Sequence, residues 1–153
     1  MNDFKDVLTC AVLFRYQKQF LICHVTGSKS ATPWSLPKGL NEKDEELNVS
    51  AARELFEETG IQVKSSDLIY KGTFPYLKGK NLALFEYISN EHVHTRELKC
   101  KSVFYHDKFK KDLPEVNNYM YITLEECTKY LNVPMCNILK NLYKKGLILK
   151  DVK

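Results

Sequence analysis

The first part of the chain alternates between short apolar runs and polar connections. Residues 8–14 (LTCAVLF) and 19–25 (QFLICHV) are rich in apolar and β-branched side chains, and the polar stretch RYQK lies between them. Two such runs around a short polar connection predict a β-hairpin. Residues 27–33 (GSKSATP) have the composition of a loop, and 33–39 (PWSLPKG) predicts a short extended piece that contains two prolines.

Strand-like patterns continue in the second part of the chain. Residues 62–74 (QVKSSDLIYKGTF) and 82–89 (LALFEYIS) predict two strands, with a turn between them in 75–81 (PYLKGKN). Residues 101–106 (KSVFYH) predict one more strand.

Two helices are predicted near the C-terminal end. Apolar residues recur at helical spacing in 123–131 (TLEECTKYL) and 133–145 (VPMCNILKNLYKK). Thr123 is placed to cap the first helix, and Glu126 three residues later completes a capping box. The mixture of strands and helices predicts an α/β fold built in layers. No internal repeat, low-complexity segment or long linker divides the sequence, so we expect residues 1–153 to form a single domain.

Length and charge narrow the picture. The 153 residues, 44% of them apolar, suffice for one domain with a hydrophobic core. Residues 1–61 carry 7 basic and 9 acidic side chains, whereas residues 62–153 carry 16 and 10. An acidic segment beside a basic one favours a metal site that faces a polyanionic ligand. A lysine-rich surface that contacts only water explains the same charges equally well.

The sequence shows no sign of a disulfide framework, a zinc site or a membrane segment. Its five cysteines form no C-x-x-C pair and are odd in number. His92 and His94 alternate as strand residues do, but no third ligand accompanies them. The N-terminal residues Asp3, Lys5 and Asp6 do not resemble a signal peptide, and no apolar stretch approaches the ~20 residues of a membrane span. We therefore expect a cytoplasmic protein with no membrane partner.

The segment 39–61 (GLNEKDEELNVSAARELFEETGI) is unusually acidic. In a helix over 49–59, Glu54, Glu57 and Glu58 share one outward face, because residues three and four apart are neighbours. Each like-charge pair destabilises the helix by roughly 0.2–0.5 kcal/mol, and a bound cation reverses that effect. Carboxylates suit Mg²⁺, which commonly bridges them to substrate phosphates. The alternative is an acidic face that contacts only water. Four residues are expected to pack inward: Ala52, Leu55, Phe56 and Thr59.

The same segment resembles the Nudix box, G-x5-E-x7-R-E-U-x-E-E-x-G-U, in which U is aliphatic. Every specified position is filled, by Gly39, Glu45, Arg53, Glu54, Leu55, Glu57, Glu58, Gly60 and Ile61. The resemblance implies the Nudix fold, a mixed β-sheet sandwiched between α-helices. It also implies hydrolysis of a nucleoside diphosphate linked to another moiety.

The resemblance further implies the roles of individual residues. Glu54, Glu57 and Glu58 would bind Mg²⁺ or Mn²⁺ together with the backbone carbonyl of Gly39. Arg53 and Glu45 would form a supporting pair that orients these carboxylates. Gly60 would end the helix, as its position also suggests from the residues alone.

The chemistry of a pyrophosphate agrees with these roles. A crowded polyanion repels a hydroxide nucleophile, so the catalyst must neutralise phosphate charge, lower the pKa of a bound water and align the attack. The family takes its general base from the box or from a glutamate on a later loop. Glu115, in the segment LPEVNNYMYITLEE, is the matching loop acid, and an exposed loop residue with no role is its alternative.

Residues that flank the box bear on the substrate. The stretch PKG is similar to that of diadenosine polyphosphate hydrolases and mRNA-decapping relatives, and Lys38 is the predicted phosphate contact. In FPYLKGK, Tyr76 would stack on a base while Lys78 and Lys80 meet phosphates. A hairpin tip that contacts only water is the alternative. We therefore expect an enzyme most like small bacterial or phage pyrophosphohydrolases that cleave dinucleoside polyphosphates, with ADP-ribose and NADH as further substrates.

Three other functions fit the same sequence, one of them hydrolysis of oxidised nucleoside triphosphates by the same chemistry in a smaller pocket. The basic second half and the tract KFKK favour phosphate contacts with RNA, and hence removal of a 5′ cap or 5′ triphosphate. A catalytically silent nucleotide-binding regulator is the third hypothesis, although it normally goes with a degraded box. The sequence is compatible with a monomer or a homodimer.

Overall fold

The structure, a computed structural model, describes residues 7–151. The prediction about a signal peptide concerns residues 1–6 and so lies outside the described residues. The helices are α1 (Leu47–Thr59), α2 (Cys127–Tyr130) and α3 (Val133–Lys144). The strands are β1 (Val7–Tyr16), β2 (Gln19–Val25), β3 (Trp34–Ser35), β4 (Lys38–Leu40), β5 (Ile69–Leu77), β6 (Lys80–Ile88), β7 (Val103–His106), β8 (Lys111–Pro114) and β9 (Val116–Thr123).

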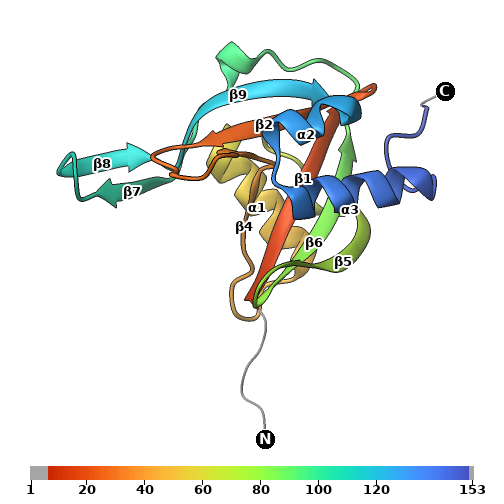
Figure 1. Cartoon of the computed structure of the whole chain (residues 1–153), viewed down its shortest axis with the longest axis horizontal. Helices are drawn as coiled ribbons and strands as arrows, with labels where there is room; N and C mark the ends of the chain where they lie inside the picture. Colours follow the sequence, from red (N-terminus) through yellow and green to blue (C-terminus); the bar gives the residue numbers. More distant parts are fainter. Residues whose placement is uncertain (1–6, 152–153) are drawn as a thin grey trace, which may run out of the picture.

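The main sheet is mixed and has β1 at its centre (Figure 1). Strand β1 pairs antiparallel with β2, as the hairpin prediction requires, and parallel with β6 in the order β3-β2-β1-β6-β5. Strand β4 pairs with β1 and β9 with β2. Parallel neighbours need a crossover connection, and the chain between β1 and β6 contains α1. The acidic segment 39–61 is thereby carried across one face of the sheet.

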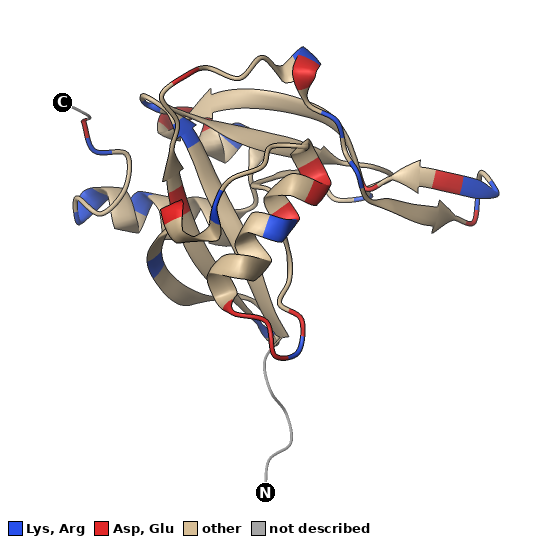
Figure 2. Cartoon of the chain, turned by 180° about the vertical axis from the view of Figure 1, so that it is seen from behind, with Lys and Arg blue, Asp and Glu red and all other residues tan. Residues whose placement is uncertain are grey.

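Helices cover both faces of this sheet. In Figure 1, α2 and α3 lie in front of it, and the view from behind in Figure 2 shows α1 across the other face. Successive residues of β1 point to opposite faces of the sheet. Ala11 and Leu13 pack in the core under α3, whereas Val12 and Phe14 pack in the core under α1. Burial on both faces explains the uninterrupted apolar run of β1. The predicted sandwich of a mixed sheet between helices is confirmed.

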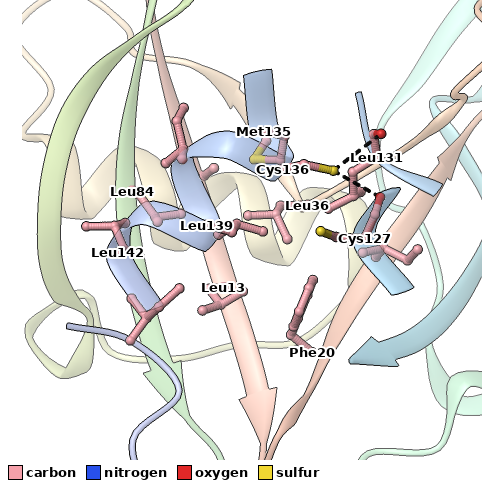
Figure 3. Packing of buried hydrophobic residues seen from close by; sticks show 14 of the residues in the cluster. Leu13, Phe20, Leu36, Leu84, Cys127, Leu131, Met135, Cys136, Leu139 and Leu142 are labelled. Carbon is pink, nitrogen blue, oxygen red and sulfur yellow. Dashed lines mark hydrogen bonds between the residues drawn. The ribbon is translucent and has the colours of Figure 1, made fainter. Parts of the chain in front are cut away.

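Helix α3 corresponds to the helix predicted over 133–145, and its apolar side chains pack into the core on its side of the sheet (Figure 3). The capping box of Thr123 and Glu126 is confirmed, but it caps a 3-10 turn, Leu124–Glu126, that leads into the short α2. The prediction of one helix over 123–131 is thus only partly right. Asn132 has extended backbone angles and its side chain accepts a hydrogen bond from the Met135 N–H, so a new helix starts there.

Two strand predictions need correction. Residues 62–68 form a loop with a 3-10 turn at Ser65–Asp67, and the strand begins only at Ile69. His92 and His94 lie in a loop between β6 and β7 rather than on a strand. Strand β7 does exist, but it pairs with β8 in a separate two-stranded sheet that projects as an arm from the main body (Figure 1). Within residues 7–151, no helix combines the length and apolar character needed to cross a membrane.

Candidate functional site

The box forms a strand, a loop and a helix that lie against one another. Strand β4 pairs with β1 through Gly39 and Cys10, and α1 packs beside both strands. Helix α1 ends at Gly60, whose positive φ of 80° places it in the left-handed region. The Gly60 N–H donates to the carbonyl of Phe56 at 2.8 Å. The prediction that Gly60 ends the helix is therefore confirmed.

Gly39 is required by the position of the Glu54 carboxylate. A Cβ atom at residue 39 would overlap the carboxylate carbon and oxygens of Glu54. Only a glycine lets this side chain lie directly against the β4 backbone. The box glycine and the first acid of the predicted metal set are thus in direct contact across the β4 and α1 interface.

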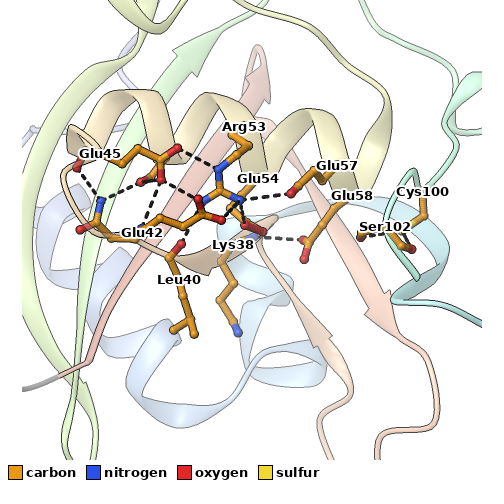
Figure 4. A network of polar contacts seen from close by, with 12 residues as sticks. Lys38, Leu40, Glu42, Glu45, Arg53, Glu54, Glu57, Glu58, Cys100 and Ser102 are labelled. Carbon is orange, nitrogen blue, oxygen red and sulfur yellow. Dashed lines mark hydrogen bonds and ion pairs between the residues drawn. The ribbon is translucent and has the colours of Figure 1, made fainter. Parts of the chain in front are cut away.

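Arg53 links the box acids into one network (Figure 4). Its Nε and Nη2 atoms donate to both oxygens of Glu45, each at 2.9 Å, and Nη2 also donates to the Leu40 carbonyl at 3.0 Å. Its Nη1 atom donates to Glu54 at 2.7 Å and to Glu57 at 3.1 Å. The bidentate contact holds the pKa of Glu45 at about 2 and raises that of Arg53. A positive charge therefore offsets the repulsion between acids on α1.

Glu58 lies deeper than the pattern predicted. Its side chain is only 8% exposed, and one carboxylate oxygen accepts a hydrogen bond from the Lys38 N–H at 3.0 Å. Burial, together with the nearby carboxylates of Glu54 and Glu115, raises the pKa of Glu58 to about 8. Burial also raises the pKa of Glu54 and lowers that of Lys38. Burial therefore disfavours the ionised forms of the Glu54 and Glu58 carboxylates.

The inward face of α1 also differs from the prediction at one position. Leu55 and Thr59 are buried and Ala52 packs against the core as expected, but Phe56 is 39% exposed. The helix buries Ala51 and Ser50 instead. The face is rotated toward β4, which brings Glu58 inward and turns Phe56 to solvent.

The last turn of α1 is held from behind by residues that the sequence did not indicate. The Tyr119 hydroxyl donates to the Glu58 carbonyl at 2.6 Å, and the Lys101 N–H donates to the Glu57 carbonyl at 2.5 Å. These bonds satisfy carbonyl groups that a helix end leaves unpaired. No local signal could have identified Tyr119, because its partner lies about sixty residues earlier in the chain.

A cavity of about 710 Å³ opens over these acids. Eight predicted site residues line it: Lys38, Gly39, Arg53, Glu54, Glu57, Glu58, Lys80 and Glu115. Eight others were not predicted: Thr9, Val25, Thr26, Leu40, Asn41, Glu42, Phe104 and Val116. Glu42 and Asn41 lie inside the box, where their sequence position could have indicated them. Phe104 reaches the cavity from the β7 strand, which only the tertiary fold brings there.

Glu115 reaches the cavity from the junction of β8 and β9. Its N–H donates to the Ser102 carbonyl at 3.1 Å, and its own carbonyl accepts from the Thr26 N–H at 3.0 Å. Two flanking segments therefore fix its backbone beside the helix acids. The structure brings together the loop acid and the box acids, and the role of Glu115 as a base stays a prediction.

Tyr76 and Lys78 do not line the cavity. Tyr76 is only 8% exposed within the core under α3, where its hydroxyl accepts a hydrogen bond from the Asn132 side chain at 2.8 Å. Lys78 is exposed at the β5–β6 turn. The prediction that Tyr76 stacks on a base is therefore wrong, because the pleat of β5 points its ring at the helix layer. Of the three predicted hairpin residues, only Lys80 faces the cavity.

The donor atoms of the site fit a divalent cation. As placed, no three acidic, histidine or cysteine side chains within residues 7–151 are gathered closely enough to hold a metal ion. The reason is that Glu54 and Glu57 point at Arg53, and Glu58 at the Lys38 N–H. The carboxylate oxygens of these residues are ligands of the hard type that Mg²⁺ and Mn²⁺ prefer. Burial raises the pKa of both Glu54 and Glu58, and a cation bound beside them would favour their ionised forms.

Comparisons with known proteins agree with the box. The family model described as NUDIX domain matches residues 5–132. A sequence search of the curated proteins returned no match. Among solved structures, the MutT protein of Methanosarcina mazei Go1 is similar with a TM-score of 0.68 and 21% identity, over 95% of this chain and 99% of that one.

Two further structures are similar in fold. One is a bifunctional NMN adenylyltransferase/ADP ribose pyrophosphatase from Francisella tularensis, complexed with AMP and a Mn ion. Its TM-score is 0.68 at 18% identity, and the match covers 94% of this chain and 43% of that one. The other is a C. elegans Ap4A hydrolase, with a TM-score of 0.61 and 18% identity over 92% of this chain and 98% of that one.

Proposed function

This chain belongs to the Nudix family and is a pyrophosphohydrolase, and we propose that it uses Mg²⁺ or Mn²⁺ to cleave dinucleoside polyphosphates such as diadenosine tetraphosphate. ADP-ribose and NADH are the proposed further substrates. We also propose that residues 1–153 form one Nudix domain, active as a monomer or homodimer in the cytoplasm.

One observation carries the proposal: five carboxylates, two lysines and an arginine line the same cavity. The negative charge comes from Glu42, Glu54, Glu57, Glu58 and Glu115, and the positive charge from Lys38, Lys80 and Arg53. A divalent cation on the carboxylates would supply charge neutralisation and an activated water. The lysines would bind phosphate oxygens that the cation leaves free. A polyphosphate matches this division of charge better than a neutral ligand does.

Each group in the cavity has a proposed task. Glu54, Glu57 and Glu58, with the carbonyl of Gly39, hold the cation. Arg53 is a positioning residue, because its bonds to Glu45 fix the guanidinium that orients Glu54 and Glu57. Glu115 would accept the proton of the attacking water. Lys38 and Lys80 orient the phosphate chain for in-line attack.

Support for the substrate comes from the cavity and from the similar structures. A cavity of about 710 Å³ lies in the range of nucleotide-sized sites. An Ap4A hydrolase and an ADP ribose pyrophosphatase share the fold. RNA 5′ ends are the alternative substrate, favoured by Lys108, Lys110 and Lys111 at the tip of the β7–β8 arm. A silent regulator is disfavoured, because the ionisable residues at the specified box positions all line the cavity or, in the case of Glu45, hold Arg53 beside it.

The test is product release from a substrate panel, with Mg²⁺ and then with Mn²⁺. The panel contains diadenosine tetraphosphate, ADP-ribose, NADH, 8-oxo-dGTP and a 5′-capped RNA, and the Glu57→Gln variant serves as the blank. We expect the highest kcat/KM for diadenosine tetraphosphate. A higher kcat/KM for the capped RNA would favour the alternative function, hydrolysis at RNA 5′ ends. No turnover on any member would favour the silent regulator.

A further inference from the structure

The β7–β8 arm presents two different faces. Strand pairing joins Phe104 with Leu113 and His106 with Lys111, so these four side chains share one face. Val103 and Tyr105 alternate with them and lie on the other face. The arm projects beyond the main sheet in both overall views (Figures 1 and 2).

A row of rings runs along the face that carries Phe104. The ring centroids of Phe104 and His106 are 5.9 Å apart, and those of His106 and Phe109 are 4.6 Å apart. Gly27 lies against His106, since a Cβ at that position would meet the imidazole at 3.3 Å. The row is thus anchored on the loop after β2, and Phe109 at its outer end remains 57% exposed.

This row continues the wall of the catalytic cavity. Phe104, its inner member, lines the cavity together with Val25 and Thr26. The outer end carries positive charge, because the Lys108 ammonium lies 5.9 Å from the Phe109 ring centroid and Lys111 pairs with His106 across the strands. A ligand whose phosphates occupy the cavity would therefore meet aromatic rings and ammonium groups where it leaves the cavity.

We propose that this face of the arm binds the second nucleoside of a dinucleoside polyphosphate, with its base stacked on Phe109 and its nearest phosphate beside Lys111. The inference rests on the proposed function, and it names the part of the substrate that the box does not contact. Every nucleobase has a π-face that an aromatic side chain can stack on. The row is short, with Phe109 as its one ring at the outer end, which suits one nucleoside better than an RNA chain.

The experiment measures binding by calorimetry, with Mg²⁺ present, to three titrants. The first is a non-hydrolysable diadenosine tetraphosphate with methylene bridges, and the second is β,γ-methylene ATP, which has one nucleoside. The third is a 5′-capped RNA oligonucleotide. For Phe109→Ala we expect the dissociation constant of the two-nucleoside probe to rise roughly tenfold, while that of β,γ-methylene ATP stays unchanged. Phe109→Trp keeps a ring and should keep the affinity.

Tyr105→Ala is the matched control. Tyr105 and Phe109 are both 57% exposed aromatic residues of the same hairpin, but Tyr105 lies on the other face. We expect no change for any titrant in this variant, which separates stacking from damage to the arm.

Several results would overturn the inference. Phe109→Ala could leave the affinity for the two-nucleoside probe unchanged, could lower the affinity for both nucleotide probes equally, or could lower only the affinity for the capped RNA. The inference would also fail if Tyr105→Ala lowered the affinity as much as Phe109→Ala does, or if the unmodified protein did not bind the two-nucleoside probe. Hydrolysis of natural diadenosine tetraphosphate by the unmodified enzyme is scored separately. If the enzyme does not hydrolyse diadenosine tetraphosphate but its binding depends on Phe109, the proposed function is rejected and the nucleoside site on the arm is kept. If the enzyme hydrolyses it and binding does not depend on Phe109, only the site on the arm is rejected.

Discussion

The two faces of the main sheet carry helices of opposite character. Helix α3 buries Met135, Leu139 and Leu142 in an apolar core and brings no acidic residue to it. Helix α1 buries Leu55 and Ala51 in the other core, but it also buries the polar groups of Ser50, Glu58 and Thr59. Both helices cross the same strands, so the difference lies in the helices and not in the sheet.

The comparison shows that the α3 face of the sheet mainly stabilises the fold, whereas the α1 face carries the acidic residues of the candidate site. Apolar burial stabilises the fold by roughly 25 cal/mol per Å². Helix α3 provides it without burying a charge of its own, and the charges buried on the same face, Arg15 and Glu86, pair with each other. On the α1 face, buried carboxylates reduce stability until a cation or Arg53 compensates them. The fold tolerates the cost of the buried carboxylates on the α1 face because apolar burial on the opposite face stabilises it independently. The following experiments test this division.

The largest effect is expected for activity at Glu57. The change Glu57→Gln keeps the shape of the side chain but removes a charge from the proposed metal site, so kcat should fall by about three orders of magnitude. Thermal stability should change little, because loss of the Arg53 ion pair and relief of repulsion with Glu54 act in opposite directions. Steady-state kinetics and a melting curve on one sample would check both. A near-normal rate would remove Glu57 from the site.

Two leucine variants separate the faces most directly. Leu139→Ala in α3 and Leu55→Ala in α1 each remove a fully buried side chain, and each should reduce the free energy of unfolding by about 2–5 kcal/mol. Only Leu55→Ala should also lower kcat, because Leu55 adjoins Glu54 and packs the helix that positions all three acids. Denaturant unfolding and kinetics at a temperature where both variants stay folded provide the measurement. Equal kcat losses would show that the α3 face also shapes the site.

A pH-dependent difference is expected between the metal-free and metal-bound protein. In the folded state the pKa of Glu58 is raised from its ordinary 4.5 to about 8, chiefly by burial. The shift favours the folded state below about pH 4.5, and this stability is lost as the pH rises toward 8. A cation favours the ionised carboxylate, so saturating Mg²⁺ should abolish this contribution. Melting temperatures from pH 5 to 9, with EDTA and with Mg²⁺, test it, and Glu58→Gln should flatten the metal-free curve. Identical curves with and without Mg²⁺ would argue against a cation near Glu58.

The smallest effect is expected next to Leu55. Phe56→Ala should change the free energy of unfolding by no more than about 0.5 kcal/mol, because the ring is largely outside the core. Parallel denaturation of Phe56→Ala and Leu55→Ala compares two adjacent apolar residues on one helix. A cost for Phe56→Ala that approaches that of Leu55→Ala would mean that its ring is covered in solution, for instance by a second copy of the chain.

Features that depend on neighbouring residues were predictable. The spacing of the box acids placed Glu54 and Glu57 together, because an α-helix brings residues three and four apart onto one side. The β1–β2 hairpin followed from two apolar runs and a short connection. The capping box at Thr123 was predictable for the same reason, since both of its bonds lie within four residues.

Features that depend on how distant segments pack were not predictable. The pattern could not show that Phe56 faces solvent, because that depends on how α1 is rotated against β4. It could not show that Tyr76 is buried, since either face of β5 might have met the helix layer.

By itself, then, the sequence determined the box helix, the identity of its acids and the elements that carry them, because helix and turn geometry are set by residues close in the chain. The tertiary structure alone brought Glu115, Lys80 and Phe104 to one cavity, buried Glu58 beneath Lys38 and separated the β7–β8 arm from the sheet. These contacts depend on strand order and register, which arise from burial summed over the whole chain and leave no signature in any short segment.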